Sequence, residues 1–128
     1  KRMSTKHGGK GGAIVNLTSV AAVIGGPGEY VDYAAAKGAI DSFTVGLARE
    51  VATEGIRVNA VAPGPYWTVL QSSGGQPMEK VKEFGGDTPL GRPGQPVEIA
   101  PLYVTLASDE CSFTSGQVWC SDGGDGVI

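Results

Sequence analysis

One stretch decides the fold: Ile56-Arg57-Val58-Asn59-Ala60-Val61-Ala62-Pro63-Gly64. Over residues 56–62, large apolar residues alternate with small or polar ones, which is typical of a strand. Pro63-Gly64-Pro65 ends the pattern, because proline donates no ladder hydrogen bond and glycine permits a sharp turn. The stretch therefore predicts a strand over 56–62 that leads directly into a turn.

A second strand and a long helix are predicted before this stretch. Residues 13–17, Ala-Ile-Val-Asn-Leu, form the short apolar run that is typical of a buried parallel strand. Residues 33–52 carry apolar side chains at helical spacing, and Gly55 follows where a helix C-cap prefers glycine. We expect the order strand, helix, strand.

A variable region, a helix and a third strand are predicted after the stretch. Residues 69–94 contain two Gly-Gly pairs, three prolines and one short helical pattern around 79–84, so we expect a mobile loop or lid there. Pro96 and Glu98 suit the first turn of a helix that continues to about residue 107, with Pro101 inside it. Residues 116–120 then predict a strand. The pattern as a whole predicts an α/β fold with a parallel sheet of about three strands plus flanking helices.

Composition argues against several classes of protein and site. The net charge is −3 and the ten lysine and arginine residues are scattered, so we expect no nucleic-acid or anionic membrane partner. No apolar run approaches the roughly 20 residues of a membrane helix, and we expect a cytoplasmic protein. Cys111 and Cys120 form no metal-binding pattern, and His7 has no neighbouring ligand, so we expect reduced thiols and no metal site.

The sharpest chemical feature is Tyr33-Ala34-Ala35-Ala36-Lys37, which on a helix places a phenol and an ammonium one turn apart. A nearby fixed positive charge favours the phenolate, so Lys37 would prepare Tyr33 to donate or accept a proton. Ser19 follows the first strand, at the edge where parallel sheets bind ligands. Taken singly, the Tyr33-x-x-x-Lys37 pair is better explained as an exposed helical tyrosine beside a solvated lysine. Ser19 by itself is explained equally by a serine that only forms a turn.

In combination, these segments resemble the short-chain dehydrogenase/reductase family. The resemblance rests on four segments in order, and these cover nearly the whole chain: 14–19 (Ile-Val-Asn-Leu-Thr-Ser), Tyr33-x-x-x-Lys37, 56–64, and 114–124 with its Thr-Ser-Gly-Gln and Asp-Gly-Gly motifs. It implies a Rossmann-like doubly wound parallel sheet, of which residues 1–128 would be the C-terminal half of an NAD(P)-binding domain.

The resemblance also assigns roles to individual residues. It makes Ser19 the catalytic donor to the substrate oxygen, Tyr33 the general acid/base, and Lys37 the lysine that tunes the tyrosine and binds the nicotinamide ribose. Pro63 and Gly64 would lie along the nicotinamide, and Thr68 would reach the cofactor, which is NAD or NADP. The chemistry implied is hydride transfer to or from a small carbonyl or alcohol substrate, with specificity in the 69–94 lid.

Two further expectations follow from the resemblance. Tyr66 and Trp67 either contact nicotinamide or substrate, or pack beneath the lid. The last helix and strand would pack against a second copy in a homo-oligomer. The family's phosphate-binding turn has no counterpart, because Gly8-Gly9-Lys10-Gly11-Gly12 precedes a strand rather than following one. We therefore expect a chain that starts in mid-domain with an uncovered strand edge, and the alternative is a truncated, non-catalytic fragment that folds and self-associates without cofactor.

Overall fold

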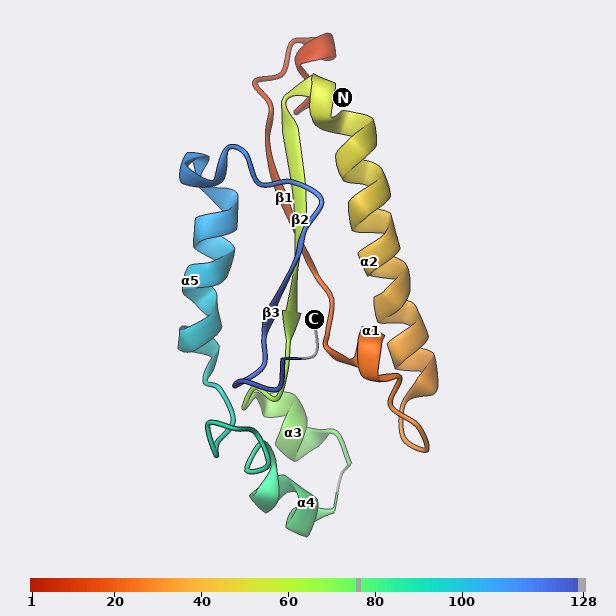
Figure 1. Ribbon diagram of the computed structural model, residues 1–128, viewed down its shortest axis with the longest axis vertical. Helices are drawn as coiled ribbons and strands as arrows, with labels where there is room; N and C mark the ends of the chain where they lie inside the picture. The colour runs from red at the N-terminus through yellow and green to blue at the C-terminus, as the bar shows by residue number, and fades with distance from the viewer. Residues whose placement is uncertain (76, 127–128) are drawn as a thin grey trace.

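The computed structural model describes residues 1–75 and 77–126, and it places a parallel sheet between two long helices (Figure 1). The sheet contains β1 (Gly12–Leu17), β2 (Ile56–Pro63) and β3 (Val118–Ser121) in the order β1-β2-β3. Both strand pairs are parallel. The predicted α/β fold with a parallel sheet is confirmed.

β2 is the central strand and the most deeply buried segment of the sheet. Val58, Ala60, Val61 and Ala62 are completely inaccessible to solvent. Residues 12–17 of β1 pair in register with residues 56–61 of β2. Because helices cover both faces of this strand, even its small residues are buried, which is the usual condition of a parallel sheet.

β3 begins two residues later than the predicted 116–120 and ends at Ser121. Gly116 has a left-handed φ of 76°, and its amide bonds Val58 O at 2.7 Å. The Gln117 amide bonds the side-chain Oδ1 of Asn59 at 3.1 Å. The regular pairing of β3 with β2 therefore starts at Val118, opposite Ala60.

The two long helices cover opposite faces of the sheet (Figure 1). The first, α2 (Val31–Val51), begins two residues before the predicted 33–52, and a short 3₁₀ turn, η2 (Ala52–Glu54), leads to Gly55 with φ 73°. The second, α5 (Pro96–Ala107), agrees with its prediction and contains Pro101. Side chains of α2 pack on β2 in a core cluster, with partly buried residues around it. The members are Ala48, Ile56 and Val58, with Met3, Ile14, Leu47 and Val51 around them.

The short helices are mostly absent from the sequence prediction. They are η1 (Thr5–His7), α1 (Ala21–Ile24), α3 (Val69–Ser73), α4 (Met78–Glu83) and η3 (Asp109–Cys111). The expected lid region, 69–94, thus contains two helices where one was predicted. Each helix has six residues or fewer, which is too short for an apolar period to be seen in the sequence. Both α3 and α4 lie beyond the carboxyl ends of the strands (Figure 1).

Two side chains of β2 hold the segment that connects α5 to β3. Arg57 donates from Nη1 to Leu106 O at 3.0 Å and from Nη2 to Ser108 O at 2.8 Å, so it binds carbonyls at the end of α5. Asn59, fully buried, donates from Nδ2 to Thr114 O at 2.9 Å and accepts from the Gln117 amide. These bonds fix where β3 enters the sheet.

Replacement of Asn59 tests whether these hydrogen bonds hold β3 in place. Asn59→Leu keeps the number and branching of the side-chain heavy atoms but leaves the part-buried Thr114 O and Gln117 amide without their partner, and a lost partner of this kind costs about 1–3 kcal/mol. We expect urea unfolding to show a loss of about 2–5 kcal/mol. Asn16→Leu is the control, because Asn16 donates a single bond, to Thr44 Oγ1 at 2.9 Å. An equal loss in both variants would contradict the role given to Asn59.

Candidate functional site

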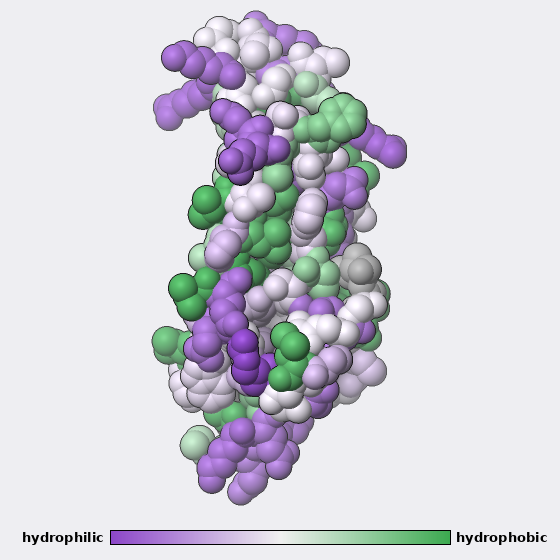
Figure 2. All heavy atoms as spheres, turned by 60° about the vertical axis from the view of Figure 1, so that its left-hand side comes forward, coloured by the Kyte–Doolittle hydropathy of each residue, from purple (hydrophilic) through white to green (hydrophobic). Residues whose placement is uncertain are grey.

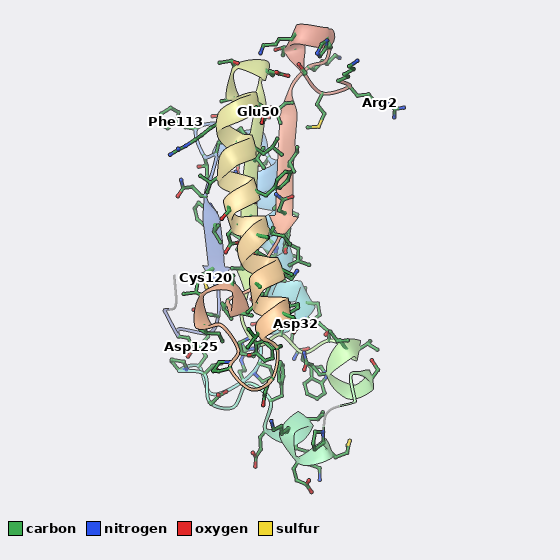
Figure 3. The ribbon with its side chains drawn as sticks, turned by 90° about the vertical axis from the view of Figure 1, so that its right-hand side faces the viewer. Arg2, Asp32, Glu50, Phe113, Cys120 and Asp125 are labelled. Atoms are coloured by element: carbon green, nitrogen blue, oxygen red, sulfur yellow. The ribbon has the colours of Figure 1, made fainter. Side chains whose placement is uncertain are left out.

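A cavity of about 350 Å³ opens at the carboxyl ends of β1 and β2. Every site residue that the sequence predicted lines it: Ser19, Tyr33, Lys37, Pro63, Gly64 and Thr68. The start of α2, marked by Asp32 in Figure 3, lies at the same end of the molecule as α3 and α4, and Glu50 lies at the other end. The fold therefore brings residues from four segments of the chain to one place.

Ser19 is positioned by the turn that connects β1 to α1. Its Oγ accepts a bond from the Ala21 amide at 3.2 Å. Within the described residues this hydroxyl donates to no protein atom, so its hydrogen is available to a ligand. The preceding residue, Thr18, is 2% exposed, and its Oγ1 donates to Lys37 O at 3.1 Å. Thr18 thereby joins the end of β1 to α2 and fixes Ser19 relative to Lys37.

Tyr33 and Lys37 share one face of α2, as the spacing predicted. The Lys37 ammonium lies 5.5 Å from the centroid of the Tyr33 ring and donates to Leu17 O at 3.1 Å. The Tyr33 ring also meets Tyr30 edge to face, with centroids 6.1 Å apart. In the described part of the chain the Tyr33 hydroxyl makes no hydrogen bond, and the residue is 46% exposed. The ring is therefore held while its hydroxyl faces solvent or a ligand.

Pro63, Gly64 and Thr68 form the side of the cavity that follows β2. The Gly64 amide bonds Ser121 O at 2.9 Å, and a Cβ on Gly64 would stand 2.7 Å from the Cα of Asp122. Glycine is thus required here by the close approach of the turn after β3. Thr68 precedes α3, and no cap hydrogen bond occupies its side chain.

The first turns of α5 supply a wall that sequence reasoning missed. Pro96, Ile99 and Tyr103 line the cavity from one face of this helix. Burial, followed by the charge of Tyr66, raises the pKa of Tyr103. Their spacing of three and four residues was a readable signal, because it places the three side chains on one helical stripe. Leu70 and Gln71 of α3 complete this side.

The predicted lid is tied down at both ends. The Trp67 amide bonds Gly94 O at 2.8 Å, and the Gly94 amide bonds Pro65 O at 2.9 Å, so the chain leaves and returns at one place. Between these ends, Lys80 of α4 bonds Glu29 at 2.5 Å. Trp67 packs near Phe84, with ring centroids 6.2 Å apart, so aromatic packing beneath the lid is the observed arrangement for this residue.

The start of α5 is anchored by a carboxylate with two partners. Glu98 accepts from both terminal nitrogens of Arg92, at 2.8 and 2.7 Å. It also accepts from the Gln95 amide at 2.8 Å, completing a capping box. The bond from Arg92, then the bond from Gln95, lowers the pKa of Glu98 to about 2. This contact fixes the cavity wall to the end of the lid.

The cysteines and the possible metal ligands lie outside this cavity lining. Both cysteines are free thiols, as expected. Burial, together with donation to Asp122, raises the pKa of Cys120 to about 12, so this thiol stays protonated. Among residues 1–75 and 77–126, no cluster of three histidine, cysteine or acidic residues could hold a metal. No helix in those ranges is long and apolar enough to cross a membrane.

Comparison with known proteins gives consistent relatives. The family model described as "Enoyl-(Acyl carrier protein) reductase" matches residues 2–125. The chain is 53% identical over 117 residues to "Uncharacterized oxidoreductase YgfF" of Escherichia coli (strain K12), covering 91% of this chain and 47% of that protein. It is 49% identical over 124 residues to "NADPH-dependent aldehyde reductase 1, chloroplastic" of Arabidopsis thaliana, covering 96% of this chain and 42% of that protein.

Solved structures agree with the sequence relatives. A crystal structure of a 3-oxoacyl-[acyl-carrier protein] reductase with bound NAD from Brucella melitensis superposes with a TM-score of 0.74 at 40% identity. The match covers 88% of this chain and 40% of that one. The chain therefore spans less than half the length of these relatives.

The Glu98 anchor predicts a pH-dependent stability. Because the folded pKa of Glu98 is about 2 and its ordinary value is 4.5, the stabilisation is complete above about pH 4.5 and is lost as the pH falls toward 2. We expect Glu98→Gln to lower the Tm by a few degrees at pH 7, and the difference from the unmodified protein to shrink as the pH falls through this window. Glu50→Gln, on the exposed face of α2, is the control. A difference that is constant with pH would contradict the anchor.

Proposed function

Since the chain belongs to the short-chain dehydrogenase/reductase family, we propose that it carries the proton-transferring, nicotinamide-facing part of an NAD(P)-dependent oxidoreductase. The substrate would be a small molecule with a carbonyl or alcohol group. The observation that supports this proposal is the shared cavity of Ser19, Tyr33 and Lys37 at the carboxyl edge of a parallel sheet. A cytoplasmic location stays a prediction.

The three residues divide the work on the substrate oxygen. Ser19 would donate its free hydroxyl hydrogen to the carbonyl oxygen and polarise the carbon. Tyr33 would give its proton to that oxygen in reduction and accept it in oxidation. Lys37, close to the Tyr33 ring, would stabilise the phenolate that remains after the proton has left.

The residues present fit the nicotinamide end of the cofactor. Lys37 uses one donor on Leu17 O, and an ammonium has three, so two remain for ribose hydroxyls. The Pro63-Gly64 turn and the Thr68 side chain would bind the nicotinamide ring and its amide. The bound cofactor supplies hydride transfer. NAD or NADP would serve, and the relatives' names include both nucleotides.

A second candidate function, association without cofactor binding, is favoured by a different observation. In the described sheet β1 is an edge strand, and its last residue, Leu17, is 53% exposed. Large apolar side chains also lie exposed on α5 and around β3. They are Val97, Val104, Phe113 and Trp119. Figure 2 shows hydrophobic side chains at several places on the α5 side of the molecule.

Cofactor titration and one substitution decide between the two candidates. We expect saturable quenching or enhancement of nicotinamide fluorescence with NADH or NADPH, and oxidation of the bound nucleotide by an aldehyde or ketone. Tyr33→Phe should lower kcat by about 10²–10⁴-fold, because it removes only the transferred proton, with cofactor affinity little changed. The Tm of the variant serves as the control for folding. Absence of cofactor binding by the unmodified protein would favour association, and full activity of Tyr33→Phe would overturn the catalytic assignment.

The exposed apolar face predicts self-association in either case. Val97 and Val104 lie seven residues apart on α5 and so share one face. Light scattering coupled to gel filtration should give at least twice the 13.1 kDa chain mass, and Val104→Lys should reduce it. Thr105→Lys, one position along the same helix, should leave it unchanged. A mass of one chain for the unmodified protein at all concentrations would contradict this proposal.

A further inference from the structure

A smaller cavity of about 230 Å³ lies beside the site. It is formed where the end of the lid and the start of α5 meet the turn after β3, with Leu90, Arg92, Glu98 and Ser121 among its lining residues. Tyr66 lines this cavity and also the 350 Å³ cavity of the site, and among the described residues no other lines both. Tyr66 therefore lies between the two cavities, and we call its ring the partition.

The partition is held in place from two directions. The Tyr66 hydroxyl and Ser121 Oγ share a hydrogen bond of 2.6 Å. The ring lies against Gly94 so closely that a Cβ on this glycine would stand 2.5 Å from ring atom Cε1. Tyr66 and Gly94 also form a parallel β-bridge. The hydroxyl of Tyr66 is thus bonded to Ser121, and one edge of its ring lies against the backbone of Gly94. The side chain is half-buried and has little freedom to rotate.

The chemistry of the smaller cavity favours an uncharged occupant. Arg92 and Glu98 neutralise each other through two bonds. Asp122 accepts from the Gly124 amide at 3.0 Å and from the Cys120 thiol. Each charged group of the lining thus already has a partner, so a bound ion would have to displace one. Leu90 and Pro65 supply apolar surface beside these groups.

We propose that Tyr66 determines specificity by closing the site against the smaller cavity and so limiting the length of the carbonyl substrate. This inference rests on the proposed function and deepens it. With the ring in place, the substrate's alkyl chain must fit the site cavity alone. Without the ring, an unbranched alkyl chain extends from the Ser19 and Tyr33 end into a further 230 Å³, where the charged groups of the lining are already paired.

A series of unbranched ketones from 2-butanone to 2-decanone tests the limit on chain length. We expect kcat/KM of the unmodified protein to fall sharply beyond a certain length, because the chain then meets the ring. Tyr66→Ala should raise the ratio of kcat/KM for 2-decanone to that for 2-butanone by at least about tenfold, since each buried methylene contributes that order of discrimination. Tyr66→Phe is the matched control, since it removes the bond to Ser121 but keeps the ring, and it should retain the original limit. If Tyr66→Ala does not fold, Tyr66→Leu makes a smaller opening and should give a smaller change in the same direction.

A binding measurement separates this inference from the proposed function. In ¹⁵N-labelled protein, 2-decanone should shift the amide signals of Ser19 and Thr68 alone. In Tyr66→Ala it should also shift those of Ser121 and Gly123. This pattern without any turnover would support the partition and count against the oxidoreductase proposal. Identical length profiles for the unmodified protein and Tyr66→Ala, shifts at both cavities in the unmodified protein, or no shift at Ser121 in Tyr66→Ala would overturn the partition.

Discussion

The parallel pairing of β1 with β2 is the constraint on which the site depends. The register that joins residues 12–17 to 56–61 brings both strands to an end at the same edge. It continues past the strands, because the Thr18 amide bonds Val61 O at 2.9 Å and the Val20 amide bonds Pro63 O at 3.1 Å. Ser19 therefore stands beside the Pro63-Gly64 turn although more than forty residues separate them. A slip of one residue would reverse every side chain of β1 and disperse the site.

The turn after β3 is built into this edge by close backbone contact. Gly64 tolerates no Cβ because Asp122 fills that space. The Ser121 carbonyl accepts from the Gly64 amide, and the Ser121 hydroxyl shares a hydrogen bond with the Tyr66 hydroxyl. β3 thus positions the wall of the 350 Å³ site cavity, although none of the residues that line that cavity belongs to β3. The hydrogen bonds of Arg57 and Asn59 on β2 also help to position β3, since they determine where β3 enters the sheet.

The sequence predicted the parts of the fold that have long periods or strong boundary signals. The strand 56–62, the helix that begins at Pro96 and the Tyr33-x-x-x-Lys37 face all lie where the pattern placed them. The short helices α1, α3 and α4 were missed or only partly predicted, because four to six residues show no helical period. The predicted start of β3 was wrong by two residues, because the Asn59 side chain accepts from the Gln117 amide, which a regular ladder would use.

The candidate site was only partly predictable, because some of its contacts join residues that are far apart in the sequence. Tyr33 and Lys37 could be found from their spacing on one helix, and Ser19 from its place after the first strand. Their roles come from the family resemblance, because geometry alone does not assign them. Tyr66 was noted beside the turn, but its partners are Ser121, 55 residues away, and Gly94. Such long-range contacts leave no trace in spacing. The cavity wall on α5 was visible in the sequence as side chains at helical spacing, but that spacing is equally typical of residues that pack in the core.

The site therefore consists of a fixed part and a weakly held part. Ser19, Tyr33 and Lys37 are borne by elements that pack on the sheet, so their geometry follows the fold. The lid is fixed at Pro65 and Gly94, yet between them Val69 and Leu70 are more than two-thirds exposed, and the exposed Glu29–Lys80 ion pair adds little stability. Substitutions in the lid can reshape the cavity without disturbing the proton-transferring residues. Tyr66 lies at the boundary of the two parts, since its backbone follows β2 and its ring contacts the residue that ends the lid. A change there alters which substrate enters while the sheet keeps the chemistry in place.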